Sequence, residues 1–159
     1  MTDLREIALD NIRNVLENKH DILQSGDADD DNAFVMMLTL TALRKLVYIK
    51  SILKTLITKK LSKQNIIGQC ALILGSVELL YMKTPDYAVI NSYVNLVKAK
   101  TDKYVAGFVN AVLRKIAKQK DIFHRVALIR EYLPTCMLSA DIIVGFPGEA
   151  EEDFLETAE

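Results

Sequence analysis

One uninterrupted apolar run, residues 64–82, limits the fold more than any other part of the sequence. It contains a single charged residue, Glu78, and no proline. The run is too long for an ordinary strand, and its alanine, leucine and glutamate residues favour a helix. Because apolar residues occupy every side of that helix, it must be buried all round or cross a membrane. The polar and small residues within it, including Gln69, Gly75 and Ser76, argue against a membrane span. We therefore predict the central helix of a soluble helical domain.

Glycines within predicted helices indicate where neighbouring helices come close. Gly68 and Gly75 lie in the apolar run, and Gly107 lies in a later helix. Each glycine costs a helix about 1 kcal/mol relative to alanine. We expect close helix contacts at these positions, where a side chain would collide with a neighbour.

The apolar spacing elsewhere predicts helices at residues 2–18, 32–43, 46–61 and 103–118. A further helix opens at Pro85, with Thr84 as its cap. The first helix is expected to carry Arg5 and Arg13 on a solvated face with local ion pairs. No proline precedes Pro85, which favours an all-α body. The buried stripe predicted for the helix after Pro85 consists of Tyr87, Ile90, Val94 and Val97.

The net charge of −1 conceals a strong asymmetry along the chain. Residues 1–31 carry a net −6, residues 32–121 a net +11 and residues 122–159 a net −6, and no acidic residue occurs in 32–77. A face with charges of one sign repels itself unless an anionic partner is bound. The middle of the chain therefore indicates a polyanionic partner.

The sequence predicts neither a metal site nor a cofactor. The aspartates of residues 25–31 lack the ligand spacing of a calcium loop and are expected to cap the next helix. His20 and His124 lie in no recognisable nucleophile or metal pattern. Cys70 and Cys136 do not form a disulfide framework, and Cys70 is expected in the core. No signal peptide is visible, so we predict a cytoplasmic protein that does not bind membranes.

Beyond about Asp121 the composition changes, because prolines return and the charge becomes acidic. The pattern predicts a short helix at 122–133, a strand at 140–144, a turn at 145–148 and an acidic helix at 149–158. A lone strand cannot form a sheet by itself. We therefore divide the chain into a body, residues 1–120, and a C-terminal helix–strand–turn–helix appendage, residues 121–159.

Four parts of the body carry a family resemblance in their order and spacing. They are DNAF (31–34) followed by TALR (41–44), ILGSVELLYM (73–82), PDYAVI (85–90) followed by NLVK (95–98), and GFVNAVLR (107–114). Over residues 3–118 the chain resembles the NusB-like domain, and the last string looks closer to the N-terminal domain of RsmB-type ribosomal RNA cytosine-5 methyltransferases. The resemblance implies an all-α bundle of about seven helices that binds RNA. The first helix departs from the antitermination factors, because it lacks their arginine-rich start.

The appendage resembles a different family. Its strings RVALIRE (125–131), ADIIVGFPGE (140–149) and EEDF (151–154) look like an internal fragment of a MiaB-like radical-SAM methylthiotransferase that acts on transfer RNA. That family holds an iron–sulfur cluster on three closely spaced cysteines, which two cysteines cannot supply. The methyltransferase domain expected after the bundle is also missing. We therefore predict that this chain is not an enzyme.

Two kinds of function remain. The first is an RNA-binding module of the antitermination or methyltransferase N-terminal type, with ribosomal RNA as its partner. Tyr48, Tyr87, Tyr93 and Tyr104 are predicted to pack inward, so contacts to the RNA backbone and shape are expected. The alternative is a module that binds a ribosomal protein or a second copy of itself, or else a non-functional remnant of a fused gene. The candidate RNA-binding residues are Arg44, Lys45, Lys50, Lys54, Lys98, Lys100 and Arg114.

Overall fold

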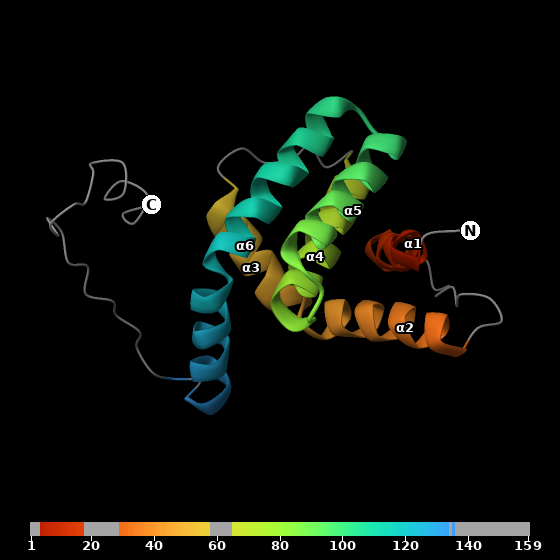
Figure 1. Ribbon diagram of the computed structural model, residues 1–159. Helices are drawn as coiled ribbons and strands as arrows, with labels where there is room; N and C mark the ends of the chain where they lie inside the picture. Colours follow the sequence, from red (N-terminus) through yellow and green to blue (C-terminus); the bar gives the residue numbers. More distant parts are fainter. Residues whose placement is uncertain (1–3, 18–28, 58–64, 134, 136–159) are drawn as a thin grey trace, which may run out of the picture. The chain divides into compact units, whose positions relative to one another are not determined.

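The computed structural model describes residues 4–17, 29–57, 65–133 and 135 (Figure 1). Within these residues the chain forms helices and no strand, which confirms the all-α class. The chain divides into two compact units, Met1–Arg125 and Val126–Glu159, and the packing described below belongs to the first. The predicted strand, turn and last helix of the appendage lie outside the described residues. The helices are α1 (Leu4–Leu16), α2 (Asp29–Arg44), α3 (Leu46–Leu56), α4 (Ile66–Tyr81), α5 (Asp86–Lys100) and α6 (Lys103–Tyr132).

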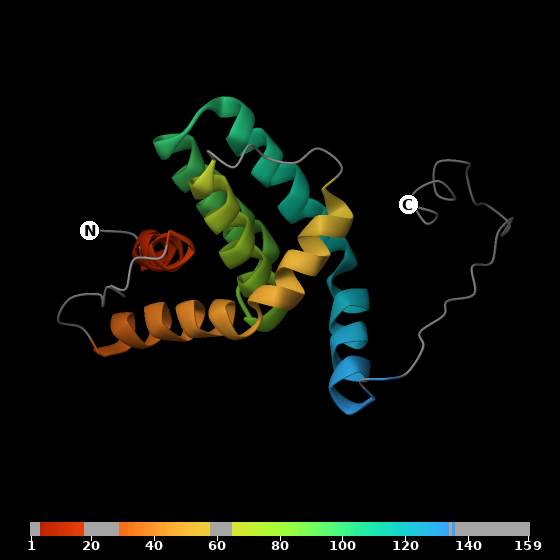
Figure 2. The ribbon, with the colours of Figure 1, turned by 180° about the vertical axis from the view of Figure 1, so that it is seen from behind.

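Helix α4 is the centre of the bundle, as predicted. Helices α1, α2, α3 and α5 all contact it, and Figures 1 and 2 show α4 and α5 running side by side from both directions. Every residue from Cys70 to Leu79 is buried. Burial raises the pKa of the Cys70 thiol to about 12, which agrees with its predicted place in the core.

Gly75 lies where α5 and α6 come close to α4. A Cβ atom at this position would lie 2.8 Å from Cδ2 of Leu113 in α6 and 3.2 Å from Cδ2 of Tyr93 in α5. The prediction of a close contact is confirmed here. It is wrong for Gly107, which is exposed and has no neighbouring atom within 4 Å of an added Cβ. Gly107 lies on the outer face of α6.

The one charge of the central helix, Glu78, is fully buried and connects three helices. Its Oε1 lies 2.6 Å from Nη2 of Arg5, and its Oε2 accepts hydrogen bonds from Nε of Arg5 at 3.0 Å and from the Tyr93 hydroxyl at 3.1 Å. The prediction that Arg5 lies on a solvated face is therefore wrong, because its guanidinium is bonded to Glu78 in another helix. The local pairing predicted for α1 does occur between Arg13 and Glu17, at 3.2 Å.

Helix α6 is continuous through the position where two helices were predicted. Neither proline nor glycine occurs between Gly107 and Pro134, so nothing breaks the helix at the predicted gap after residue 118. Two contacts tie this part of α6 to the body. Lys120 Nζ lies 2.9 Å from both carboxylate oxygens of Asp86 in α5, and the Tyr48 hydroxyl of α3 donates a 2.6 Å hydrogen bond to the Phe123 carbonyl.

The other helix boundaries differ from the predicted ones by small amounts. Helix α2 begins at Asp29, three residues before the predicted start. Helix α5 begins at Asp86 with Pro85 as its N-cap residue, so the proline stands one position earlier than predicted. The predicted last turn of the third helix falls on residues 58–61, which lie outside the described residues.

Candidate nucleic-acid interface

The segment from the end of α2 through α3 presents a cationic face. Arg44, Lys45, Lys50 and Lys54 are all exposed, and Lys50 and Lys54 stand one turn apart on α3. Like charges at this spacing destabilise a helix by about 0.2–0.5 kcal/mol. Among the described residues, no ion pair joins Lys50 or Lys54 to a carboxylate. Their ammonium groups are therefore available to an anionic partner.

Lys45 is held differently from the other three cations. Its Nζ lies 5.6 Å from the centre of the Tyr81 ring at the end of α4, which is the geometry of a cation–π contact. The contact orients the ammonium group without neutralising its charge. Lys45 therefore stays in the cationic face with a more restricted position.

The two candidates at the end of α5 have different surroundings. Lys98 is exposed, whereas Nζ of Lys100 lies 2.6 Å from Oε1 of Glu6 in α1. The ion pair neutralises Lys100 and joins the end of α5 to the first helix. A contact between Lys100 and RNA would have to compete with Glu6, so Lys100 is a weaker candidate than Lys98.

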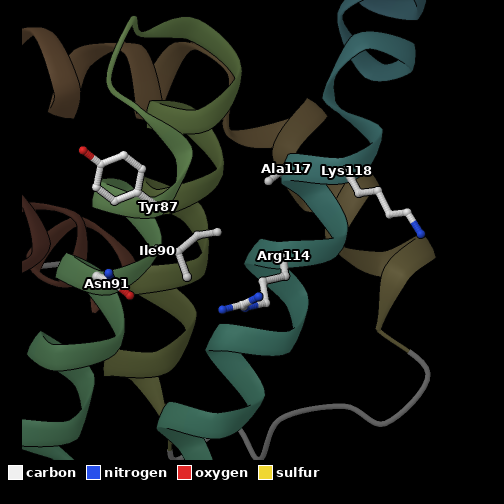
Figure 3. Close-up of a pocket in the computed structure, with 6 residues that line it drawn as sticks. All are labelled: Tyr87, Ile90, Asn91, Arg114, Ala117 and Lys118. Atoms are coloured by element: carbon white, nitrogen blue, oxygen red, sulfur yellow. The ribbon is translucent and has the colours of Figure 1, made fainter.

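The remaining candidate, Arg114, lies at an open pocket between α5 and α6 (Figure 3). The pocket has a volume of about 450 Å³. Ile90 and Arg114 point toward one another across it, and Lys118 extends away from it. Nε of Arg114 donates a 3.2 Å hydrogen bond to Oδ1 of Asn110, one turn earlier on α6. The lining residues are Tyr87, Ile90, Asn91, Arg114, Ala117 and Lys118.

Two of the tyrosines predicted to pack inward are on the surface. Tyr87 is 73% exposed and Tyr104 is 74% exposed, whereas Tyr93 is fully buried and Tyr48 is half-buried. The predicted stripe of α5 is therefore wrong at Tyr87. Burial raises the pKa of Tyr48, whose hydroxyl is bonded to α6 as described above.

The spacing of the apolar residues in α5 contains the signal that Tyr87 lies on the surface. Its buried residues are Val89, Ile90, Tyr93, Leu96 and Val97, which recur at one-turn spacing. This stripe leaves Tyr87 and Asn91 together on the outer side, one turn apart. The sequence prediction missed both residues, although they share the pocket with Arg114.

Metal clusters and membrane-spanning helices are absent from the part of the chain that the structure describes. No group of three or more metal-ligating side chains occurs among the residues that the structure describes. Likewise, no helix within the described ranges is long and apolar enough to cross a membrane. His20 and Cys136 lie outside the described residues, and His124 belongs to α6.

The fold defines the class of this protein as an all-α bundle assembled around a buried central helix, with cationic outer faces. Comparison with known families is consistent with this class. The chain belongs to the NusB family, whose family model matches residues 2–118.

Two groups of curated relatives confirm the two resemblances found in the sequence. The ribosomal RNA small subunit methyltransferase B of Proteus mirabilis is 29% identical over 126 residues, which cover 76% of this chain and 30% of the relative. The tRNA-2-methylthio-N(6)-dimethylallyladenosine synthase of Thermus thermophilus is 57% identical over 49 residues, 29% of this chain and 10% of the relative. The enzyme of that name from a Sulfurihydrogenibium species is 54% identical over 39 residues, 24% of this chain and 9% of the relative. The chain thus spans less than a third of each of these proteins.

Proposed function

We propose that the helical body is an RNA-binding module without catalytic chemistry of its own, and that its partner is ribosomal RNA. The observation that carries the proposal is the cationic face of α2 and α3, where Lys50 and Lys54 stand one turn apart with no carboxylate partner among the described residues. Membership of the NusB family and the name of the Proteus relative support RNA as the polyanion.

The cationic face favours contacts to phosphate groups. Lysine ammonium groups bind phosphate as point charges on flexible stems, without reading the base sequence. Binding of this kind releases counterions, so the logarithm of the affinity falls linearly with the logarithm of the salt concentration. For four phosphate contacts to single-stranded RNA, the slope is about −3.

The test is fluorescence anisotropy of a ribosomal RNA fragment with the full chain across a salt series. The variant Lys50→Gln/Lys54→Gln removes two charges from the face, so the slope should become shallower by about 1.4. The control is Lys83→Gln, an exposed lysine outside the candidate set, which should leave the slope unchanged. If the parent does not bind at low salt, or if both variants change the slope equally, the proposal is wrong.

A protein-binding module is the second candidate, because some large apolar side chains are exposed. Val47 is 85% exposed on α3, the helix that carries Lys50 and Lys54, and Ile122 is exposed on α6. A ribosomal protein or a second copy of the chain could cover such residues. Size-exclusion chromatography at low and high salt tests self-association, which hydrophobic contacts would maintain at high salt and ionic contacts would not.

A further inference from the structure

We infer that the pocket between α5 and α6 binds one unstacked nucleotide of single-stranded RNA, with the base on the Tyr87 ring and a phosphate on Arg114. The inference rests on the proposed function and adds a specific site to it. It also replaces the expectation that the protein contacts RNA through the backbone and shape alone. Its starting point is the exposure of Tyr87, an aromatic ring that contributes little to the core.

The walls of the pocket have the composition of a nucleotide site. Single-stranded RNA is recognised through bases that stack on aromatic side chains and form hydrogen bonds along their edges. Tyr87 offers an aromatic face, and the exposed amide of Asn91 offers both a donor and an acceptor one turn further along α5. Ile90 and Ala117 supply an apolar floor. The volume of about 450 Å³ lies within the usual range for small-molecule sites, about 300–1,000 Å³.

Arg114 is positioned to bind the phosphate of the same nucleotide. The hydrogen bond from Nε to Asn110 anchors the guanidinium and leaves the two terminal nitrogens facing the pocket side of α6. A guanidinium can bind two phosphate oxygens at once, with stronger hydrogen bonds than neutral donors form. Figure 3 shows Ile90 and Arg114 facing one another and the Tyr87 ring on the outer side of α5, so the nucleotide would extend across the open side of the pocket from the ring to the guanidinium.

An ion pair joins α5 and α6 next to the pocket. Asp86, directly before Tyr87, accepts two 2.9 Å contacts from Lys120, three residues after Ala117. This ion pair fixes the start of α5 against α6 and neutralises the one carboxylate next to the tyrosine. The lining residues themselves include no acidic side chain that would repel a phosphate.

Tyr104 provides a matched control for the stacking role. It is exposed to the same degree as Tyr87 and also lies in the first turn of its helix, but it does not line the pocket. The variants Tyr87→Leu and Tyr104→Leu therefore remove equally exposed rings, with similarly small effects on folding. A difference in RNA affinity between these two variants would therefore be due to the pocket and not to the loss of an exposed ring in general.

The experiment measures anisotropy with the full chain and two probes, a labelled single-stranded RNA and the same RNA annealed to its complement. Loss of one stacked base should lower the single-strand affinity of Tyr87→Leu by about 5- to 150-fold, with the salt slope unchanged. Arg114→Gln should lower the affinity and make the salt slope shallower by about 0.7. Tyr104→Leu should bind as the parent does, and binding of the duplex should not depend on Tyr87.

Two outcomes separate the pocket from the proposed function. If the parent binds RNA with a steep salt slope but Tyr87→Leu and Tyr104→Leu have equal RNA affinities, the pocket inference is wrong and the proposed RNA-binding function still stands. If the parent binds neither probe, both proposals fail. A second measurement uses the emission of the six tyrosines, because the chain has no tryptophan. Adenosine monophosphate should quench the parent more than Tyr87→Leu, and equal quenching would also overturn the inference.

Discussion

Removing Arg5 should destabilise the bundle far more than its place near the start of the chain suggests. Arg5→Ala leaves the Glu78 carboxylate buried without its ion-pair partner, while the hydrogen bond from the Tyr93 hydroxyl remains. Breaking a buried pair in this way costs about 3–5 kcal/mol of the free energy of unfolding. The reverse substitution, Glu78→Ala, should cost less, about 2–3 kcal/mol, because the Arg5 side chain is 20% exposed and can reach water.

Urea denaturation followed by circular dichroism measures both changes and their coupling. Because Arg5 and Glu78 contact each other directly, the double variant should cost less than the sum of the single variants, by about 2 kcal/mol. Arg13→Ala is the matched control, since the Arg13–Glu17 pair is local and only partly buried and contributes about 0.5 kcal/mol. An Arg5→Ala loss below about 1 kcal/mol, or strict additivity of the two substitutions, would refute the reasoning.

Hydrogen exchange would show where the loss of Arg5 acts. The pair joins α1 to α4 and α5, so Arg5→Ala should weaken protection of the amides of α1 first. Local opening of α1 with intact protection in α4 would locate the contribution of the pair in docking of the first helix. Uniform loss of protection across the bundle would show that the pair stabilises the whole fold.

Two further predictions follow from the helix packing and from Cys70. Gly75→Ala should lower the free energy of unfolding by up to about 2 kcal/mol, because its contact with the buried Leu113 side chain outweighs the gain in helix propensity. Gly107→Ala should raise the free energy of unfolding by up to about 1 kcal/mol, because nothing lies near the added methyl group. Urea denaturation measures both changes, and a change of the same sign in the two variants would contradict the packing described. The second concerns Cys70, whose thiol holds its proton more tightly in the folded chain, with a pKa of about 12 against an ordinary value of 9.0. Stability should therefore be unaffected below about pH 9 and should fall as the pH rises toward 12, by up to about 1.4 kcal/mol per pH unit more in the parent than in Cys70→Ala. Equal slopes in the two chains would disprove this contribution.

The helices could be predicted from the sequence because their signals are local. The apolar run predicted at 64–82 is α4, Ile66–Tyr81, since its composition alone requires burial on all sides. The helix break predicted after residue 118 was wrong. A change in charge and composition does not end a helix when no proline or glycine is present.

The site was less predictable, because it depends on which helices come together. Periodicity does not identify the partner of Glu78, since Arg5 lies 73 residues away in sequence. It does not show that Glu6 neutralises Lys100 either. The error at Tyr87 has a different origin: at the first turn of α5, a small change in helix phase moves a side chain from the core to the surface. The roles of the seven candidate cations remain predictions.

The buried pair also sets an order of events during synthesis. The first helix leaves the ribosome long before its partner does, because Glu78 is made 73 residues after Arg5. At about 5–20 residues per second, the delay is roughly 4 to 15 s. Throughout that interval Leu9 and Ile12 have no α4 to cover them, although α1 can already pack against α2, which is made earlier. The bundle is therefore complete only when translation has passed the central helix, and the ion pair between α1 and α4 forms late.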